Sequence, residues 1–285
     1  MRILASILLS ACAAAQTANP PAPLPPDLEA LSKRVDLAHH PKGPIAEVTA
    51  FAGELELLAA GGEQSAQVDL AVKYLQVKGA KDKVNHLIRY EVRNAGRPIE
   101  RGRDTFGFWH LVQGKAQDLT EEDAEDRAAC QRDTNLARQL VRFLEPGTVL
   151  RQLTDPSKVR EEDFRLGREA AAVKCLTVEG GLAAFPLLQR GGDDAPVLVK
   201  IYVSKADDRL LALKVWPLVG GARHDAGLEI VRLLGLHERD GLLVPHQLEH
   251  LYCDAGGKMQ LQSRATIAKL SLRPDLKVDA LDRPK

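Results

Sequence analysis

The alternation of apolar and polar side chains constrains the fold of this 285-residue chain more than any other feature of its sequence. It is clearest at residues 83–94, KVNHLIRYEVRN. Every second residue from Val84 to Val92 falls on one face, while Arg89, Glu91 and Arg93 fall on the other. Side chains alternate in this way across a β-strand, and a strand with one polar face is typical of an antiparallel sheet covered on one side. The stretch therefore predicts a half-buried antiparallel strand.

Similar stretches occur on both sides of the middle of the chain. We predict strands at 47–59, 67–79, 99–113, 169–180, 195–205, 209–218, 241–254 and 258–274. Turn residues separate them, as at Asn94-Ala95-Gly96 and Asp207-Asp208. Residues 154–164, TDPSKVREEDF, are expected to form a surface segment between two groups of strands.

Two segments have helical periodicity instead. Residues 27–40 place Leu28, Leu31 and Val35 on one face, and Pro41 ends the pattern. The second segment, 121–144, follows a sequence typical of a capping box, Thr120-Glu121-Glu122-Asp123. Its apolar stripe ends before Pro146-Gly147 and consists of Leu136, Ala137, Leu140, Val141 and Leu144.

The order of these elements is helix, strands, helix, strands. It predicts an α+β fold with one large antiparallel sheet and the helix 121–144 across one of its faces. The sequence shows no long internal repeat, and no Pro/Gly-rich linker interrupts residues 27–285. We therefore expect residues 27–285 to form a single domain.

Residues 1–12 are typical of an export signal that ends in a lipid-attachment site. Arg2 precedes the apolar run Ile3 to Leu9, which is too short to cross a bilayer of about 30 Å. Leu9-Ser10-Ala11-Cys12 resembles a bacterial lipobox, in which the cysteine is diacylated and becomes the mature N-terminus. Ala13-Ala14-Ala15 offers a second cleavage site, typical of ordinary secretion, and a retained helix is a third alternative. We expect Cys12 to be the lipid anchor.

Residues 13–26 indicate a tether. They consist of Ala, Gln, Thr, Asn, Leu and Pro and end in NPPAPLPP, which favours an extended polyproline II conformation. At about 3.1 Å per residue, such a segment holds a domain up to about 43 Å from a membrane. A disordered tail without function is the alternative.

The charge composition excludes one class of partner. Lys and Arg together number 39, as do Asp and Glu, and the basic residues are scattered among acids. Without a net positive field, nucleic-acid binding is not expected. No stretch after the N-terminus approaches 18 consecutive apolar residues, so the body is expected to be soluble. With the lipobox, this places the protein in the cell envelope facing the periplasm, with a soluble periplasmic or secreted form as the alternative.

Three stretches, in this order, resemble the bacterial lipoprotein-carrier superfamily (LolA/LolB-like). They are VTAFAGELEL after the first helix, the hairpin VLVKIYVSKADDRLLALKV, and the ending from Gly241 to Pro284. In that ending, Asp240-Gly241 and Pro245 precede a hairpin, and Leu270-Ser271-Leu272 precedes an extended tail. The resemblance lies in patterning over most of residues 27–284.

The resemblance implies a curved antiparallel sheet, an incomplete barrel, with helices packed on its concave side around an apolar cavity. It implies a non-enzymatic protein of the periplasm or outer membrane that binds acyl chains of a lipid or lipoprotein, without a cofactor. The alternative is a structural or sensory lipoprotein with a filled core that binds a protein partner. As ligand-lining candidates we name Ile88, Tyr90, Phe106, Trp109 and Trp216, for which plain core packing is the alternative.

One motif suggests metal chemistry. Residues 246–250, HQLEH, spell H-x-x-E-H, the inverted zincin motif of metal-dependent hydrolases. That chemistry needs a helix, whereas Pro245 and the alternating apolar residues here predict a strand, in which His246 and His250 would lie about 13 Å apart. We therefore expect no zinc site. His39-His40 and His224 are expected to be solvated in loops.

The remaining cysteines leave two alternatives open. With Cys12 acylated, Cys130, Cys175 and Cys253 are an odd number. One disulfide with one buried thiol, or three buried thiols, are both compatible with the sequence.

Overall fold

The computed structural model describes residues 25–43, 47–61, 64–79, 84–93, 99–166, 170–188, 195–225, 227–254, 256–273, 275–281 and 283–284. The export signal, Cys12 and nearly all of the expected tether lie outside these residues.

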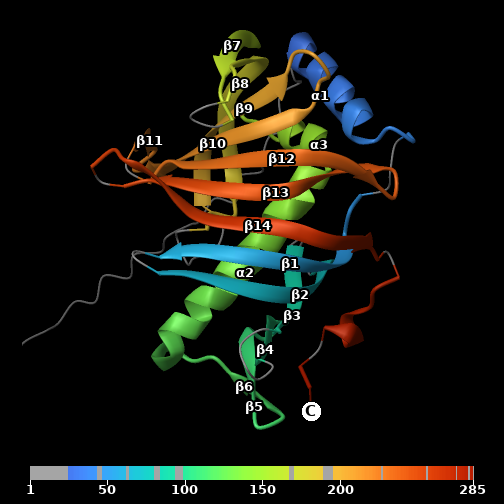
Figure 1. Ribbon diagram of the computed structural model, residues 1–285, viewed down its shortest axis with the longest axis vertical. Coiled ribbons are helices and arrows are strands. Elements are labelled where there is room, and N and C mark those ends of the chain that lie inside the picture. Colours follow the sequence, from blue (N-terminus) through green and yellow to red (C-terminus); the bar gives the residue numbers. More distant parts are fainter. Residues whose placement is uncertain are drawn as a thin grey trace, which may run out of the picture.

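One antiparallel sheet of 14 strands dominates the described part of the chain (Figure 1). The first strands are β1 (Ala50–Gly61), β2 (Gln64–Lys78), β3 (Val84–Val92), β4 (Ile99–Arg103), β5 (Phe108–Val112) and β6 (Lys115–Asp118). The later strands are β7 (Arg160–Phe164), β8 (Val173–Phe185), β9 (Ala195–Ser204), β10 (Leu210–Val219), β11 (Ala222–Arg223), β12 (Glu229–Arg239), β13 (Leu242–Cys253) and β14 (Met259–Leu272). The order across the sheet is β6-β5-β4-β3-β2-β1-β14-β13-β12-β10-β9-β8-β7, and β11 pairs with β10.

The last long strand joins the two halves of the chain, because β14 pairs with β1 on one side and β13 on the other. The two end strands, β6 and β7, do not pair with each other, so the sheet is an open, incomplete barrel. In Figure 1 the central strands cross the front, and the strands at both ends turn behind them.

The helices are α1 (Pro26–His39), α2 (Ala124–Leu144) and α3 (Pro146–Arg151), with short 3-10 turns η2 (Glu121–Asp123) and η3 (Val278–Ala280). Helix α2 runs behind the central strands and contacts β3, β4 and β13, so the sheet curves around it (Figure 1). The predicted capping box lies at the 3-10 turn η2, directly before this helix, with the Asp123 carboxylate accepting bonds from the Thr120 backbone and hydroxyl. The predicted fold class, one large curved antiparallel sheet with helices on its concave side, is confirmed.

Several boundaries differ from the prediction. The expected strand 99–113 is two strands, because the chain turns at residues 104–107 between β4 and β5. Part of the expected surface segment 154–164 forms the edge strand β7, whose side chains remain mostly exposed. The sequence reasoning also missed β12, in which Gly235 lies in the left-handed region at φ 63° although the register with β13 is continuous on both sides of it.

The main core lies between α2 and the concave face of the sheet. From the helices, Leu28, Leu31, Leu140 and Phe143 are at most 1% exposed, and they meet the alternate strand residues Phe51, Tyr74, Ile88, Val199, Val231 and Ile267. Fully burying an apolar side chain of this size stabilises a protein by about 1.5–3 kcal/mol. The helices therefore hold the sheet in its curved form.

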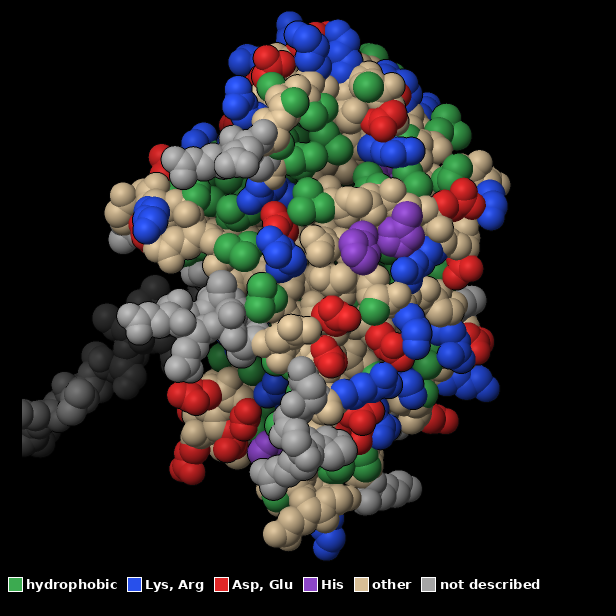
Figure 2. Space-filling model, in the orientation of Figure 1, with side chains coloured by type: hydrophobic (Ala, Val, Ile, Leu, Met, Phe, Trp, Pro, Cys, Tyr) green, Lys and Arg blue, Asp and Glu red, His purple; other side chains and the backbone are tan. Residues whose placement is uncertain are grey.

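In the described part of the chain, two small apolar clusters lie on the outer face of the sheet, among many charged side chains. Figure 2 shows Lys, Arg, Asp and Glu side chains intermixed over this face, and Glu54 there pairs with both Arg93 and Lys269. The last residues of the chain cover one apolar cluster, in which the fully buried Leu281 packs against Ala50, Leu75 and Leu87.

The structure decides between the two cysteine alternatives. Cys130, Cys175 and Cys253 are all buried free thiols. Burial is the largest cause that raises the pKa of the Cys130 and Cys175 thiols to about 11, so both stay protonated. Among the described helices, none is both long and apolar enough to cross a membrane.

Candidate functional site

A cavity of about 740 Å³ remains between the C-terminal half of α2 and one end of the sheet, and we call it the α2 cavity. Its walls come from α2 and α3, from β2, β3, β4 and β8, and from the turn between β4 and β5. The lining residues are Glu47, Tyr74, Gln76, Val84, Asn85, His86, Arg103, Asp104, Thr105, Phe106, Gly107, Arg138, Val141, Arg142, Glu145, Thr148, Val149, Gln152 and Ala184.

Helix periodicity explains what α2 contributes. Val141 and Arg142 lie three and four residues after Arg138, and Glu145 lies three residues after Arg142, so the four share one face beside the apolar core stripe. The Arg142 guanidinium donates to the Ala184 carbonyl at 2.9 Å and to Gln152 Oε1 at 3.2 Å, and it lies over the Phe185 ring. These contacts fix this arginine at the junction of α2, α3 and β8.

Facing the helix, β2 and β3 supply an aromatic pair. The Tyr74 hydroxyl and His86 Nδ1 share a hydrogen bond of 2.6 Å, and the two rings are stacked. The pKa of His86 is lowered to about 3, first by burial and then by the guanidiniums of Arg138, Arg103 and Arg142. The imidazole is therefore neutral at pH 7, and the charged groups that act on it are all arginines.

The carboxylates of the cavity have other neighbours. Glu145 Oε1 accepts a bond from the Val48 backbone at 2.9 Å, and burial is the main cause that raises the pKa of this carboxyl. Glu47 accepts from the Gln76 amide at 3.4 Å. The lining thus contains three acids and three arginines, and all three arginines lower the pKa of His86.

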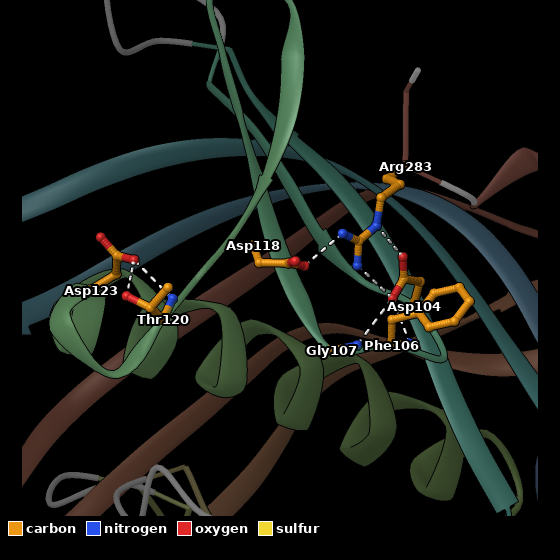
Figure 3. Close-up of polar contacts among 7 residues, drawn as sticks. All are labelled: Asp104, Phe106, Gly107, Asp118, Thr120, Asp123 and Arg283. Atoms are coloured by element: carbon orange, nitrogen blue, oxygen red, sulfur yellow. Dashed lines mark hydrogen bonds and ion pairs between the residues drawn. The ribbon is translucent and has the colours of Figure 1, made fainter.

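The turn of residues 104–107 forms one edge of the cavity, and we call it the edge turn (Figure 3). Asp104 Oδ1 accepts bonds from the backbone of Phe106 at 2.8 Å and of Gly107 at 3.1 Å. Arg283 reaches back from the C-terminal tail and bridges Asp104 Oδ2 and Asp118 Oδ1, each at 2.6 Å. Although burial opposes it, Arg283 and the two backbone groups lower the pKa of Asp104. The edge turn is therefore held by the end of the chain.

Polar side chains on another face of α2 fix the helix to the sheet. Asn135 donates to the Leu187 carbonyl at 2.8 Å, and Gln139 donates to the Pro186 carbonyl at 2.7 Å. Gln139 Oε1 lies 2.7 Å from Nε2 of the fully buried His250 on β13. These bonds keep the α2 face of the cavity at a fixed distance from the sheet.

The ligand-lining candidates from the sequence lie in three different places. Phe106 lines the α2 cavity and is 88% exposed at its edge. Ile88, Tyr90 and Trp109 are buried by at least 99%; the Tyr90 hydroxyl donates to Cys130 Sγ, and the Trp109 ring packs on Gly102, where a Cβ would lie 2.8 Å from it. Trp216 lies on β10, far across the strand order, and donates to Asp225.

The H-x-x-E-H motif lies on β13, as the alternation predicts. His246 is exposed, His250 is fully buried, and Glu249 accepts two bonds from Arg264. In the described part of the chain, no group of three or more His, Cys, Asp or Glu side chains could hold a metal ion. The expectation for His39 and His40 is wrong: both are buried at the end of α1, and their Nε2 atoms contact the Leu210 amide and the Leu144 carbonyl.

The sequence reasoning missed the arginines of the cavity. His86 was placed on the inner face of β3, but nothing local showed that Arg103, Arg138 and Arg142 converge near it. The available signal was the spacing of Arg138 and Arg142, four residues apart and next to the apolar stripe of a helix expected to lie on the sheet.

No family model and no curated protein matches this chain. Among solved structures, it is similar to a LolA superfamily protein from Nitrosomonas europaea, with 13% identity, 90% of this chain and 98% of that chain covered, and a TM-score of 0.48. A DUF1329 family protein from Desulfovibrio piger has 11% identity, with 90% of this chain and 98% of that chain covered, and a TM-score of 0.49. An outer membrane lipoprotein-sorting protein domain from Vibrio parahaemolyticus has 10% identity, with 89% of this chain and 95% of that chain covered, and a TM-score of 0.44. One of these structural neighbours is named as a member of the superfamily that the sequence resembles.

Proposed function

We propose that this protein is a non-enzymatic binding protein of the cell envelope that holds the acyl chain of a lipid or lipoprotein in the α2 cavity. The observation that carries the proposal is the cavity itself. Its volume of about 740 Å³ falls within the range of about 300–1,000 Å³ typical of small-molecule sites.

The shape of the core supports this choice over a filled sheet interior. The apolar core is continuous under most of α2, and the cavity lining is mixed, with Val141 and Val149 among polar residues. Tyr74, Val141 and Val149 give that space an apolar wall on which a hydrocarbon chain would be removed from water. The polar bonds of α2 and of the edge turn hold the walls of this space in place.

We expect the substitution Ala184→Phe to remove bound lipid. Ala184 lines the cavity from β8, and a phenyl ring at this position would occupy the space of the ligand, while the backbone bond from Arg142 remains. The measurement is native mass spectrometry of the full-length protein purified from bacterial membranes, with lipid retained. Wild type should carry one lipid per chain, and the variant less than a tenth as much.

The matched control is Ala183→Phe. Ala183 is the neighbouring residue on the same strand, is exposed, and does not line the cavity. It should retain lipid like wild type. Wild type that carries no lipid under these conditions, or lipid retained equally by both variants, would contradict the proposal that the α2 cavity is a lipid site.

We also propose that Cys12 anchors the protein to a membrane. The lipobox letters directly precede it, and a Pro-rich segment follows. One acyl chain binds a membrane only marginally, whereas two or three hold a domain durably. Wild type expressed in a bacterial host should fractionate with membranes and incorporate labelled palmitate, and Cys12→Ser should do neither. A soluble wild-type protein that begins at Gln16 would show ordinary secretion instead.

A further inference from the structure

The C-terminal end of the chain is attached to the rest of the fold at two points. We call residues 275–281 and 283–284 the C-terminal strap. In the described residues, the last backbone bond from this end of the chain to the sheet is donated by the Arg273 amide to β1 at 3.1 Å, and the backbone bonds that follow are local. Side chains therefore hold the strap: Leu281 is fully buried in a small apolar cluster, and Arg283 reaches the edge turn.

Arg283 contacts the edge turn with its whole guanidinium (Figure 3). Its Nε and Nη2 donate to the two oxygens of Asp104 at 2.6 and 3.1 Å, and its Nη1 donates to Asp118 at 2.6 Å. The guanidinium also lies over the Phe106 ring, 5.9 Å from the ring centroid. The Asp104 side chain is only 5% exposed, so this bidentate ion pair is shielded from water and is stronger than one on an open surface.

The edge turn is bonded within itself. The Asp104 amide donates to the Gly107 carbonyl at 3.0 Å, and the Asp104 carboxylate accepts from the amides of Phe106 and Gly107. A turn closed by such bonds moves as one unit, and all four of its residues line the α2 cavity. Arg283 lies outside that lining, so it acts on the cavity through the position of the turn.

The strap also joins parts of the fold that are far apart in the strand order. It follows β14 in the middle of the sheet, whereas Asp118 is the last residue of the end strand β6. The strands after the edge turn, β5 and β6, have only 5 and 4 residues, and short strands with few neighbours open locally at a low free-energy cost. The contacts of Arg283 therefore tie the part of the sheet that opens most easily to its centre.

We propose that the C-terminal strap is a gate for the α2 cavity, and that Arg283 is the positioning residue that keeps the gate closed by holding the edge turn through Asp104. This gate rests on the proposed function and determines how fast the ligand enters and leaves. Because Arg283 lies outside the lining, its release lowers the barrier for entry and exit alike and leaves the equilibrium affinity almost unchanged. Loops that close over a site commonly control exchange in this way.

The test measures the exchange of cis-parinaric acid, whose fluorescence rises in an apolar site. Stopped-flow mixing of the loaded full-length protein with excess palmitate gives the dissociation rate, and titration of the probe gives the Kd. Arg283→Gln should raise the dissociation rate about tenfold, the change expected from the loss of one charged hydrogen bond, and should leave the Kd within about twofold of wild type. A variant that only damaged the fold would bind more weakly at equilibrium.

Asp104→Asn is the second variant, because asparagine keeps an oxygen acceptor for the backbone of the edge turn but removes the charge that binds Arg283. It should also speed dissociation, and combining it with Arg283→Gln should add little further, since both substitutions break one contact. Arg273→Gln is the matched control, because this arginine precedes the strap and pairs with the exposed Asp275. It should exchange the probe like wild type.

The outcomes separate the gate from the binding function. Wild-type dissociation rates in both Arg283→Gln and Asp104→Asn, an equal rise in Arg273→Gln, or a faster rate matched by an equal loss of affinity would each overturn the gate and leave acyl-chain binding intact. A wild-type protein that does not bind cis-parinaric acid would remove the acyl-binding function itself, and the gate with it.

Discussion

Lowering the pH from 7 to 5 is expected to reduce the free energy of unfolding by about 4 kcal/mol through two buried histidines, His39 and His250. Burial is the largest cause that lowers the pKa of His39 to about 4 and of His250 to about 3. In the unfolded chain each ring takes up a proton near pH 6.5. Between pH 6.5 and about 4 the unfolded state therefore binds more protons than the folded state. The contribution of these rings to the free energy of unfolding is fully present above this window and is lost as the pH falls through it.

The contacts of His39 explain why its ring stays unprotonated in the folded protein. Its Nε2 accepts a bond from the Leu210 backbone at 2.9 Å, and this bond would be lost on protonation. At pH 5, which is 1.5 units below the pKa of histidine in the unfolded chain, protonation of each ring on unfolding lowers the free energy of unfolding by about 2 kcal/mol. His86, with its lowered pKa, acts in the same direction, whereas Asp133, whose pKa burial raises to about 6, opposes it by about 1 kcal/mol. A loss of this size is a large part of the 5–15 kcal/mol typical of folded proteins.

Urea unfolding between pH 5 and 7 measures this dependence. His250→Gln lowers stability at pH 7 but should flatten the slope of unfolding free energy against pH by about 2 kcal/mol over the interval. His246→Gln, on the same strand but exposed, is the control and should keep the wild-type slope. A slope that His250→Gln leaves unchanged would contradict the assignment of the pH dependence to this ring.

Local periodicity explains why so much of the fold could be predicted. The alternation in β3 and the stripe in α2 depend on residues that are neighbours in sequence, so they are visible without a structure. The errors lie where long-range contacts decide. Residues 160–164 carry too many charges to suggest a strand, yet they pair as an edge where charged side chains remain in water. His39 looked solvated because its partner, Leu210, is 171 residues away.

The candidate site was harder to predict for the same reason. Phe106 and Trp109 belong to one aromatic stretch, but only the turn at 104–107 determines that the first is exposed at the cavity and the second is buried on Gly102. The arginines of the cavity are ordinary surface residues in a strand and a helix until the curvature of the sheet brings β4 opposite the C-terminal half of α2. The helices and strands were predictable from local periodicity, whereas the site depends on how the sheet curves around α2.

The second large effect concerns the bond between α2 and β13. Gln139 donates to the Pro186 carbonyl, so its Oε1 accepts from Nε2 of His250, and all of these atoms are buried. Gln139→Leu should reduce the free energy of unfolding by about 3 kcal/mol, because two buried polar groups lose their partner and each costs about 1–3 kcal/mol. Chemical unfolding at pH 7 measures the change.

A double-mutant cycle separates this bond from simple loss of packing. His250→Leu alone leaves Gln139 Oε1 without its buried donor, whereas the double substitution removes both ends of the bond. The double variant should therefore be about 1–2 kcal/mol more stable than the sum of the single effects predicts. The exposed His246→Leu, combined with Gln139→Leu, should be additive. Additivity in the His250 cycle as well would show that the Gln139–His250 bond does not hold α2 against the sheet.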